Sequence, residues 1–294
     1  MKLRPLLAIA LLASSAVVAA CSSSSDNTCS STGQALTVCA TGKTVKGVDV
    51  SVYQGTVTWS SVKNAGVVFG IARVSDGTGT LDSTFATNWK NMKSNGIVRG
   101  VYQFFEPGED PTQQANLVIS QVKSAGGFDT GDLPPVMDME VTGGQTDATI
   151  QSHMQTWLDA IEKAVGRKPL IYTNESTSSH FGGKFTSYPL WVASWGASCP
   201  TMPNGFAAWE FWQNADDGSV SGISGAVDTD EFNGTLADLQ SWANPNPPPP
   251  ADAGAPSDAG AKDAGSASDA APAEDASAPP PSKDAGEPPN PCAP

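Results

Sequence analysis

Two carboxylates stand two residues apart near the middle of the chain, inside the otherwise apolar run Val136-Met137-Asp138-Met139-Glu140-Val141. A run of this kind is typical of a buried strand. Because alternate strand residues point the same way, we expect Asp138 and Glu140 to share one face and the two methionines the other. Burial and mutual repulsion raise the pKa of at least one such carboxyl, which would supply a general acid near neutral pH. The alternative is a solvent-facing or helix-capping acid pair.

Three further acids lie in the first and last apolar runs of the same region. Asp49 stands in Gly47-Val48-Asp49-Val50-Ser51, and Asp228 and Asp230 stand in Val227-Asp228-Thr229-Asp230. If these runs are the first and last strands of a closed sheet, they are neighbours, and Asp49 and Asp228 can meet over one mouth. A single acid at a strand end is usually a cap or turn residue. Acids from several strands aimed at one mouth favour catalysis instead.

The elements that must position these acids alternate between strands and helices. Strands are expected at Val45–Tyr53, Val67–Ser75, Ile97–Phe105, Leu133–Val141, Pro169–Thr173, Pro189–Trp195, Ala208–Gln213 and Gly225–Phe232, and helices at Trp59–Ala65, Asp82–Ser94, Thr112–Ala125 and Asp147–Val165. Pro111 begins one of these helices, and Asp147 stands where a helix cap is expected. The alternation of strands and helices predicts a parallel sheet with right-handed crossovers. Beyond Thr173 the helical periodicity is weak. We therefore predict an α/β fold, an irregular (β/α)8-like barrel with eight strands and several late helices missing; a doubly wound open sheet is the alternative.

Aromatic residues crowd the ends of the same runs. We interpret Trp209 and Phe104 as core, and we assign Tyr102, Tyr172, Trp191, Trp195 and Asp230 to substrate binding. Tyr and Trp offer large apolar faces with a polar handle, which suits stacking on sugar rings. The chain has two histidines, no Cys-x-x-Cys and no phosphate-cradling glycine loop, so we expect neither a metal nor a cofactor. Carboxylates and aromatic rings without these features favour a carbohydrate substrate.

These runs resemble the family 25 glycoside hydrolases, the Chalaropsis-type lysozymes. The resemblance rests on Gly47 to Gly55, Gly100 to Phe104, Asp138-Met139-Glu140, Leu170 to Thr173, Leu190 to Ala193, Phe211-Trp212-Gln213 and Val227 to Asp230, in the family's order over roughly residues 44–238. It implies an irregular eight-stranded barrel that hydrolyses the β-1,4 bond from N-acetylmuramic acid to N-acetylglucosamine in peptidoglycan. It also implies Glu140 as general acid and Asp49, Asp138 and Asp228 as the other mouth carboxylates. Val52 and Gln103 stand where the family often has His, from which we expect altered subsite preference.

The spacing of Asp138 and Glu140 also resembles the Asp-x-Glu of substrate-assisted enzymes, in which the sugar's own N-acetyl oxygen attacks. In this hypothesis Glu140 protonates the leaving oxygen and Asp138 positions the acetamido group. The rival has Asp228 or Asp49 as direct nucleophile or base. The alternative function is a non-catalytic surface lipoprotein that binds peptidoglycan or another glycan.

The ends of the chain indicate export. Residues 1–20 are predicted as a lipoprotein signal peptide, with Cys21 as the lipidated residue, followed by a polar tether over 21–43, the barrel over 44–243 and a disordered Pro/Ala/Asp-rich tail over 244–294. The protein is expected to face the periplasm or cell surface, held to the membrane only through this anchor, or else to be secreted. The net charge of −14 argues against nucleic acid as a partner. The expected partner is the glycan strand of peptidoglycan, and we expect the protein to be a monomer.

Four other cysteines remain: Cys29, Cys39, Cys199 and Cys292. An even number in an exported chain favours disulfides, and four cysteines allow three pairings. Cys29 with Cys39 is the local option, and Cys39 with Cys199 is a long-range one.

Overall fold

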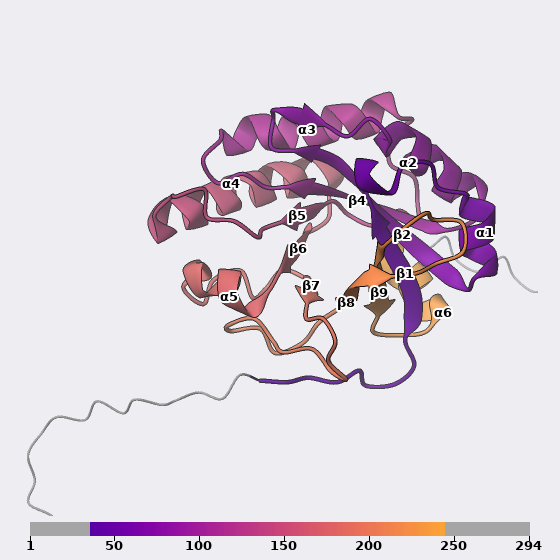
Figure 1. Ribbon diagram of the computed structural model, residues 1–294. Coiled ribbons are helices and arrows are strands. Elements are labelled where there is room, and N and C mark those ends of the chain that lie inside the picture. Colours follow the sequence, from indigo (N-terminus) through magenta and orange to yellow (C-terminus); the bar gives the residue numbers. More distant parts are fainter. Residues whose placement is uncertain (1–35, 245–294) are drawn as a thin grey trace, which may run out of the picture. The chain divides into compact units, whose positions relative to one another are not determined.

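The computed structural model describes residues 36–244, and its strands close into a barrel (Figure 1). The order around the sheet is β1-β9-β8-β7-β6-β5-β4-β2, and a β1–β2 pairing closes it. The short β3 lies outside this ring and pairs antiparallel with the end of β2. The strands are β1 (Val45–Val50), β2 (Val67–Asp76), β3 (Thr80–Leu81), β4 (Val98–Phe104), β5 (Val136–Asp138), β6 (Leu170–Thr173), β7 (Leu190–Ala193), β8 (Phe211–Gly218) and β9 (Val227–Phe232). Closure excludes the open-sheet alternative and confirms the eight-stranded barrel.

One strand departs from the expected parallel sheet. β9 runs antiparallel to both β8 and β1, whereas the other neighbouring barrel strands are parallel. A connection of only eight residues, 219–226, separates β8 from β9. A parallel return needs a crossover of a dozen residues or more, so this short connection can form only a hairpin.

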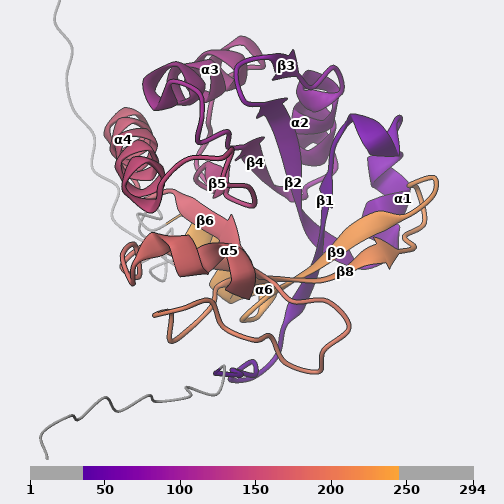
Figure 2. The same ribbon diagram turned by 60° about the vertical axis from the view of Figure 1, so that its left-hand side comes forward.

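Four helices cover the first half of the barrel: α1 (Trp59–Asn64), α2 (Phe85–Ser94), α3 (Pro111–Ser124) and α4 (Asp147–Val165). Figure 2 shows them grouped beside β1 to β6, with irregular loops following β7. Pro111 opens α3 as expected, and Asp110 caps that helix by accepting from the Thr112 backbone N–H at 2.8 Å. Thr146, rather than Asp147, is the N-cap of α4.

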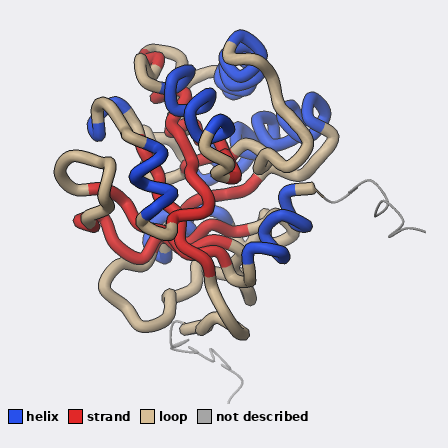
Figure 3. The backbone as a smooth tube through the Cα atoms, turned by 90° about the vertical axis from the view of Figure 1, so that its right-hand side faces the viewer, coloured by secondary structure: helices blue, strands red, loops and turns tan. Residues whose placement is uncertain are grey.

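The second half of the barrel has few helices, as expected. α5 (Glu175–Ser178) and the 3-10 turn Ser179–Phe181 follow β6, no helix lies between β7 and β8, and α6 (Leu236–Ala243) follows β9. In the tube drawing the red strands form the middle of the barrel, and blue helices lie around them (Figure 3). Sequence reasoning missed α6, whose capping box joins Thr235 and Asp238. None of the helices within residues 36–244 has the length and apolar composition needed to cross a membrane.

The two faces of the sheet bury two separate apolar clusters. The cluster inside the barrel includes Phe69, Leu170 and Trp191, while the outer cluster, under the helices, includes both Met137 and Met139. The methionines therefore take the face opposite the acids, as alternation predicts. The interior is tightly filled: a Cβ added to Gly47 would lie 2.1 Å from a ring carbon of Phe69. Most polar side chains that point into the barrel lie toward its mouth end, and Asp230 lies deeper.

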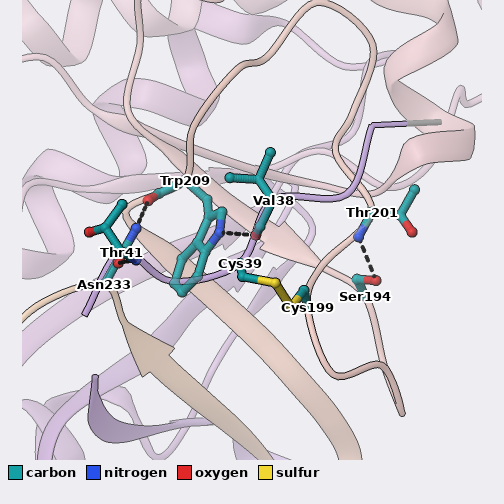
Figure 4. Close-up of a disulfide and its surroundings, with 8 residues drawn as sticks. All are labelled: Val38, Cys39, Thr41, Ser194, Cys199, Thr201, Trp209 and Asn233. Atoms are coloured by element: carbon teal, nitrogen blue, oxygen red, sulfur yellow. Dashed lines mark hydrogen bonds between the residues drawn. A yellow bond between two sulfur atoms is a disulfide. The ribbon is translucent and has the colours of Figure 1, made fainter. Parts of the chain in front are cut away.

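Part of the predicted tether belongs to the barrel unit. Cys39 forms a disulfide with Cys199 in the loop after β7, which selects the long-range pairing (Figure 4). Beside it, the Val38 N–H donates to the Pro200 carbonyl at 3.1 Å, and the Trp209 indole N–H donates to the Val38 carbonyl at 2.7 Å. Residues 36–39 thus pack against the loop that joins β7 to β8. The predicted signal peptide, Cys21 and the tail from residue 245 lie outside the described residues.

Candidate active site

A pocket of ≈ 200 Å³ opens at the C-terminal ends of the parallel strands. Its lining combines carboxylates, aromatic rings and one amide: Asp49, Tyr102, Asp138, Glu140, Tyr172, Trp191, Trp195, Gln213, Asp216 and Asp228. All four acids that the sequence assigned to catalysis are present, two at the end of β5 and two on the β1–β9 pair. Four of the five residues assigned to substrate binding are there as well.

Asp138 is the last residue of β5, and Glu140 lies just beyond the strand. The segment stays in line with its neighbours, because the Phe105 N–H donates to the Asp138 carbonyl at 2.8 Å and the Met139 N–H donates to the Tyr172 carbonyl at 3.0 Å. The two carboxyl groups therefore keep their strand-like alternation, and a hydrogen bond can join them when one is protonated. Asp138 Oδ1 is buried and has no partner among the described residues.

Asp49 and Asp228 meet across the β1–β9 pair, where they are direct register partners. Asp49 is near the end of β1, whereas Asp228 is near the start of β9. The antiparallel direction of β9 brings its beginning, rather than its end, to the mouth. The expected meeting of these two acids is confirmed, through a strand orientation that the sequence did not predict.

Asp230 lies two residues further along the same antiparallel strand and therefore deeper in the barrel. It is 1% exposed, and its Oδ1 accepts from the Trp191 indole N–H at 2.9 Å. Asp230 was expected to contact substrate, but it does not line the pocket, and its hydrogen bond orients Trp191 instead. Among the aromatic residues, Trp209 is core as expected, but Phe104 is only half-buried.

Gln213 is a site residue that sequence reasoning did not single out. Its side-chain carbonyl accepts from the Tyr172 hydroxyl and from the Trp195 indole N–H, both at 2.8 Å. These two donors determine which way the amide faces, so its NH2 group must point to Asp49, to which it donates at 2.8 Å. One buried amide thus positions two aromatic rings and a carboxylate. Its place in the strand motif Phe211-Trp212-Gln213 was the available signal.

Gln103, in contrast, does not reach the pocket. It is fully buried on the outer face of β4, where it donates to the Ser75 hydroxyl at 2.9 Å and accepts from the Trp157 indole N–H at 2.7 Å. The expectation that this departure alters subsite preference is therefore wrong for Gln103. The side chain holds α4 to the sheet instead.

Burial dominates the electrostatics of the pair on β5. It raises the pKa of Asp138 well above the usual range, and the negative charge of Glu140 raises it further. Burial also raises the pKa of Glu140, while the hydrogen bond with Asp138 opposes that rise. Two carboxyls in contact, each with a raised pKa, favour a state in which they share one proton. The arrangement provides a proton donor and an acceptor on the same wall of the pocket.

On the opposite wall of the pocket, burial also raises the pKa values of the two acids, Asp49 and Asp228. Burial raises the pKa of Asp49, as do the charges of Asp230 and Asp228, and the hydrogen bond from Gln213 opposes the rise. Burial likewise raises the pKa of Asp228, to about 6, helped by the charge of the exposed Asp216 at the rim. Within residues 36–244, no group of three or more His, Cys, Asp or Glu side chains is arranged to hold a metal ion.

An eight-stranded barrel whose mouth gathers five carboxylates among aromatic rings belongs to the class of barrel enzymes that act on carbohydrates. Comparison with known proteins specifies the family. The model of the glycosyl hydrolases family 25 matches residues 48–223. This chain belongs to that family, and it is a glycoside hydrolase of the lysozyme and muramidase kind.

Individual relatives agree with this assignment. Lysozyme M1 from Streptomyces globisporus is 39% identical over 213 residues, which are 68% of this chain and 71% of that protein. The N,O-diacetylmuramidase of a Chalaropsis species is 31% identical over 207 residues, which are 63% of this chain and 96% of that protein. The crystal structure of a bacterial lysozyme from Streptomyces coelicolor matches with a TM-score of 0.63 at 36% identity, covering 68% of this chain and 97% of that one.

Proposed function

We propose that this protein hydrolyses the β-1,4 bond between N-acetylmuramic acid and N-acetylglucosamine in peptidoglycan. The observation that carries the proposal is the pocket itself, in which acids with raised pKa values share one mouth with Tyr172, Trp191 and Trp195. Relatives that are named lysozymes and muramidases support the same substrate.

Glu140 is the general acid in this proposal. It is half-buried at the pocket wall, and burial raises its pKa, which favours the protonated form that a general acid needs. As the bond from the anomeric carbon to the glycosidic oxygen breaks, the Glu140 proton passes to the departing oxygen. The resulting carboxylate then takes a proton from the water that completes hydrolysis.

Asp138 positions the substrate's N-acetyl group. Asp138 lines the pocket, where its carboxylate can accept a hydrogen bond from the acetamido N–H, which turns the acetyl oxygen toward the anomeric carbon as internal nucleophile. This contact favours the ionised form of Asp138. The proton that the two carboxyls share is then left on Glu140, where the reaction needs it. Asp49 and Asp228 hold substrate and tune the charge of the pocket.

The first experiment is digestion of purified peptidoglycan, with detection of newly reducing muramic acid ends. Glu140→Gln should lower the rate by about 10²–10⁴-fold, the usual contribution of general acid catalysis. The matched control is Glu175→Gln, which makes the same change on the exposed surface of α5 and should leave the rate unchanged. Near-normal turnover by Glu140→Gln would refute the assignment.

A second experiment separates substrate assistance from direct attack by Asp49 or Asp228. Peptidoglycan whose muramic acid lacks the N-acetyl group offers no internal nucleophile, so the enzyme's kcat on this substrate should be far lower than on normal peptidoglycan. Asp138→Asn should lower kcat more than it raises KM, because orienting a nucleophile matters chiefly in the transition state. Similar kcat values on both substrates would rule out assistance and leave Glu140 as the acid.

We also propose that the protein is exported and held to the membrane through lipidated Cys21. The support is the charged start, the short apolar stretch and Val18-Ala19-Ala20 directly before this cysteine. Cys21→Ser should move the protein from the membrane fraction to the soluble fraction, whereas Cys29→Ser should not. Unchanged membrane fractionation of Cys21→Ser would contradict the anchor.

A further inference from the structure

Exposed apolar side chains gather at the mouth of the barrel. Six large apolar residues are substantially exposed within residues 36–244: Leu36, Val52, Tyr53, Leu81, Trp195 and Leu236. Four of them, Val52, Tyr53, Leu81 and Trp195, follow the C-terminal ends of β1, β2 and β7, which form the mouth. Tyr53 is the most exposed, at 82%. Exposed apolar groups gathered beside a catalytic pocket suggest a binding surface rather than chance.

The backbone under Tyr53 is firmly held. Tyr53 lies in the 3-10 turn Val52–Gln54, which has a capping box formed by Ser51 and Gln54. The Val52 N–H donates to Asp82 Oδ2 at 2.7 Å, and the Gln54 amide donates to the Ala226 carbonyl at 3.4 Å. These contacts join the turn to the segment after β3 on one side and to the β8–β9 hairpin on the other. A turn held in this way keeps its central side chain at the rim.

The ring itself is supported from below. The guanidinium carbon of Arg73 lies 5.2 Å from the centre of the Tyr53 ring, within cation–π range. Arg73 is in turn held by Asp82, to whose Oδ2 its Nε donates at 3.2 Å. One face of the ring is thus supported by a buried cation, and the rest is open to solvent. This is a preorganised aromatic platform.

The platform is continuous with the pocket. Arg73 on β2 is the register partner of Tyr102 on β4, and Tyr102 lines the pocket. Trp195, the other exposed aromatic residue of the mouth, follows β7, so that β8 and β9 lie between the two rings around the barrel. A chain crossing the mouth over the β8–β9 side would pass from Trp195 over Asp228 on β9 to Tyr53 after β1.

We infer that Tyr53 forms an outer subsite that stacks on a sugar ring of the glycan strand beyond the catalytic pocket. The inference rests on the proposed function, because it takes the substrate to be a polymer of amino sugars. The pocket of ≈ 200 Å³ is below the usual 300–1,000 Å³ of small-molecule sites, so it encloses only a short part of such a polymer. A flat ring that keeps few rotatable bonds can add affinity for the emerging strand at low entropic cost.

The test measures binding rather than turnover. Proteins carrying Glu140→Gln, alone or with Tyr53→Ala, Tyr53→Phe or Leu236→Ser, are titrated with long peptide-free peptidoglycan strands and with a single tetrasaccharide. Tyr53→Ala should weaken binding of long strands roughly two- to tenfold, the range expected for one aromatic stacking contact, and should affect the tetrasaccharide much less. Tyr53→Phe keeps the ring and should bind within about twofold of its parent.

Leu236→Ser is the matched control, because it removes an exposed apolar side chain from α6, at the end of the barrel opposite the mouth. Its binding should equal that of the parent. Equal binding of long strands by Tyr53→Ala and its parent would overturn the subsite, and so would an equal loss for long strands and the tetrasaccharide. Failure of the wild-type protein to release reducing ends would count against the proposed hydrolysis alone, since the binding comparison needs no turnover.

Discussion

Removing the disulfide between Cys39 and Cys199 should markedly destabilise the barrel. The bond closes a loop across 160 residues of sequence. In the chain-entropy model, closing a loop of this length raises the free energy of the unfolded chain by about 5 kcal/mol. When a native disulfide is removed, the measured loss of stability is commonly about 2–5 kcal/mol. Because a domain's whole stability is about 5–15 kcal/mol, the Cys39→Ser/Cys199→Ser variant should lose a large share of it.

Equilibrium unfolding in urea, followed by tryptophan fluorescence, measures this loss. The midpoint should fall, and the m-value should rise, because an unfolded chain without the cross-link exposes more surface. Wild-type protein kept under reducing conditions should unfold like the double variant, and Cys29→Ser under oxidising conditions should unfold like the wild type. A loss below about 1 kcal/mol would refute the reasoning, since the local contacts of Val38 would then hold the segment without the bond.

Three further predictions concern the pocket and the barrel wall. Gln213→Leu removes the hydrogen-bond donor that lowers the pKa of Asp49. The acidic limb of the pH profile of kcat/KM should therefore move to higher pH, and kcat should fall roughly tenfold. Superimposable pH profiles of the variant and the wild type would contradict this. The pKa of Asp228 is raised from 3.8 to about 6, so its contribution to stability is present below 3.8 and is lost as the pH rises to about 6; Asp228→Asn should therefore reduce the loss of Tm between pH 4 and 7, measured by thermal unfolding. Arg99→Ala leaves Asp132 buried without its partner at 2.8 Å and should lower the free energy of unfolding in urea by about 3–5 kcal/mol; a loss below about 1 kcal/mol would contradict this.

Much of the barrel could be predicted from local pattern. Each barrel strand overlaps the apolar run expected for it, and α1 to α4 overlap the predicted helices, because a period of two or of 3.6 residues is written directly in the sequence. Alternation also placed Asp138 and Met137 on opposite faces. The errors in local features were small: the N-cap of α4, for example, is Thr146 and not Asp147.

The candidate site was harder to predict, because depth and partnership are not local properties. Asp228 and Asp230 have the same side-chain direction, yet one lines the pocket and the other is enclosed beneath it. Their difference follows from the reversed direction of β9, which places the earlier residue nearer the mouth. Gln213 has an ordinary strand position, and its importance comes from three partners on β1, on β6 and after β7.

The sequence by itself therefore determined the barrel, the family and the acids that share its mouth, since periodicity and ordered motifs are carried by neighbouring residues. Only the tertiary structure decided which end of β9 faces the mouth, which buried amide orients Asp49, and that Cys39 pairs with Cys199. Each of these depends on contacts between residues far apart in the chain. The physical reason is that a strand pattern specifies a face but neither the neighbour of the strand, nor its direction, nor the depth at which a side chain lies.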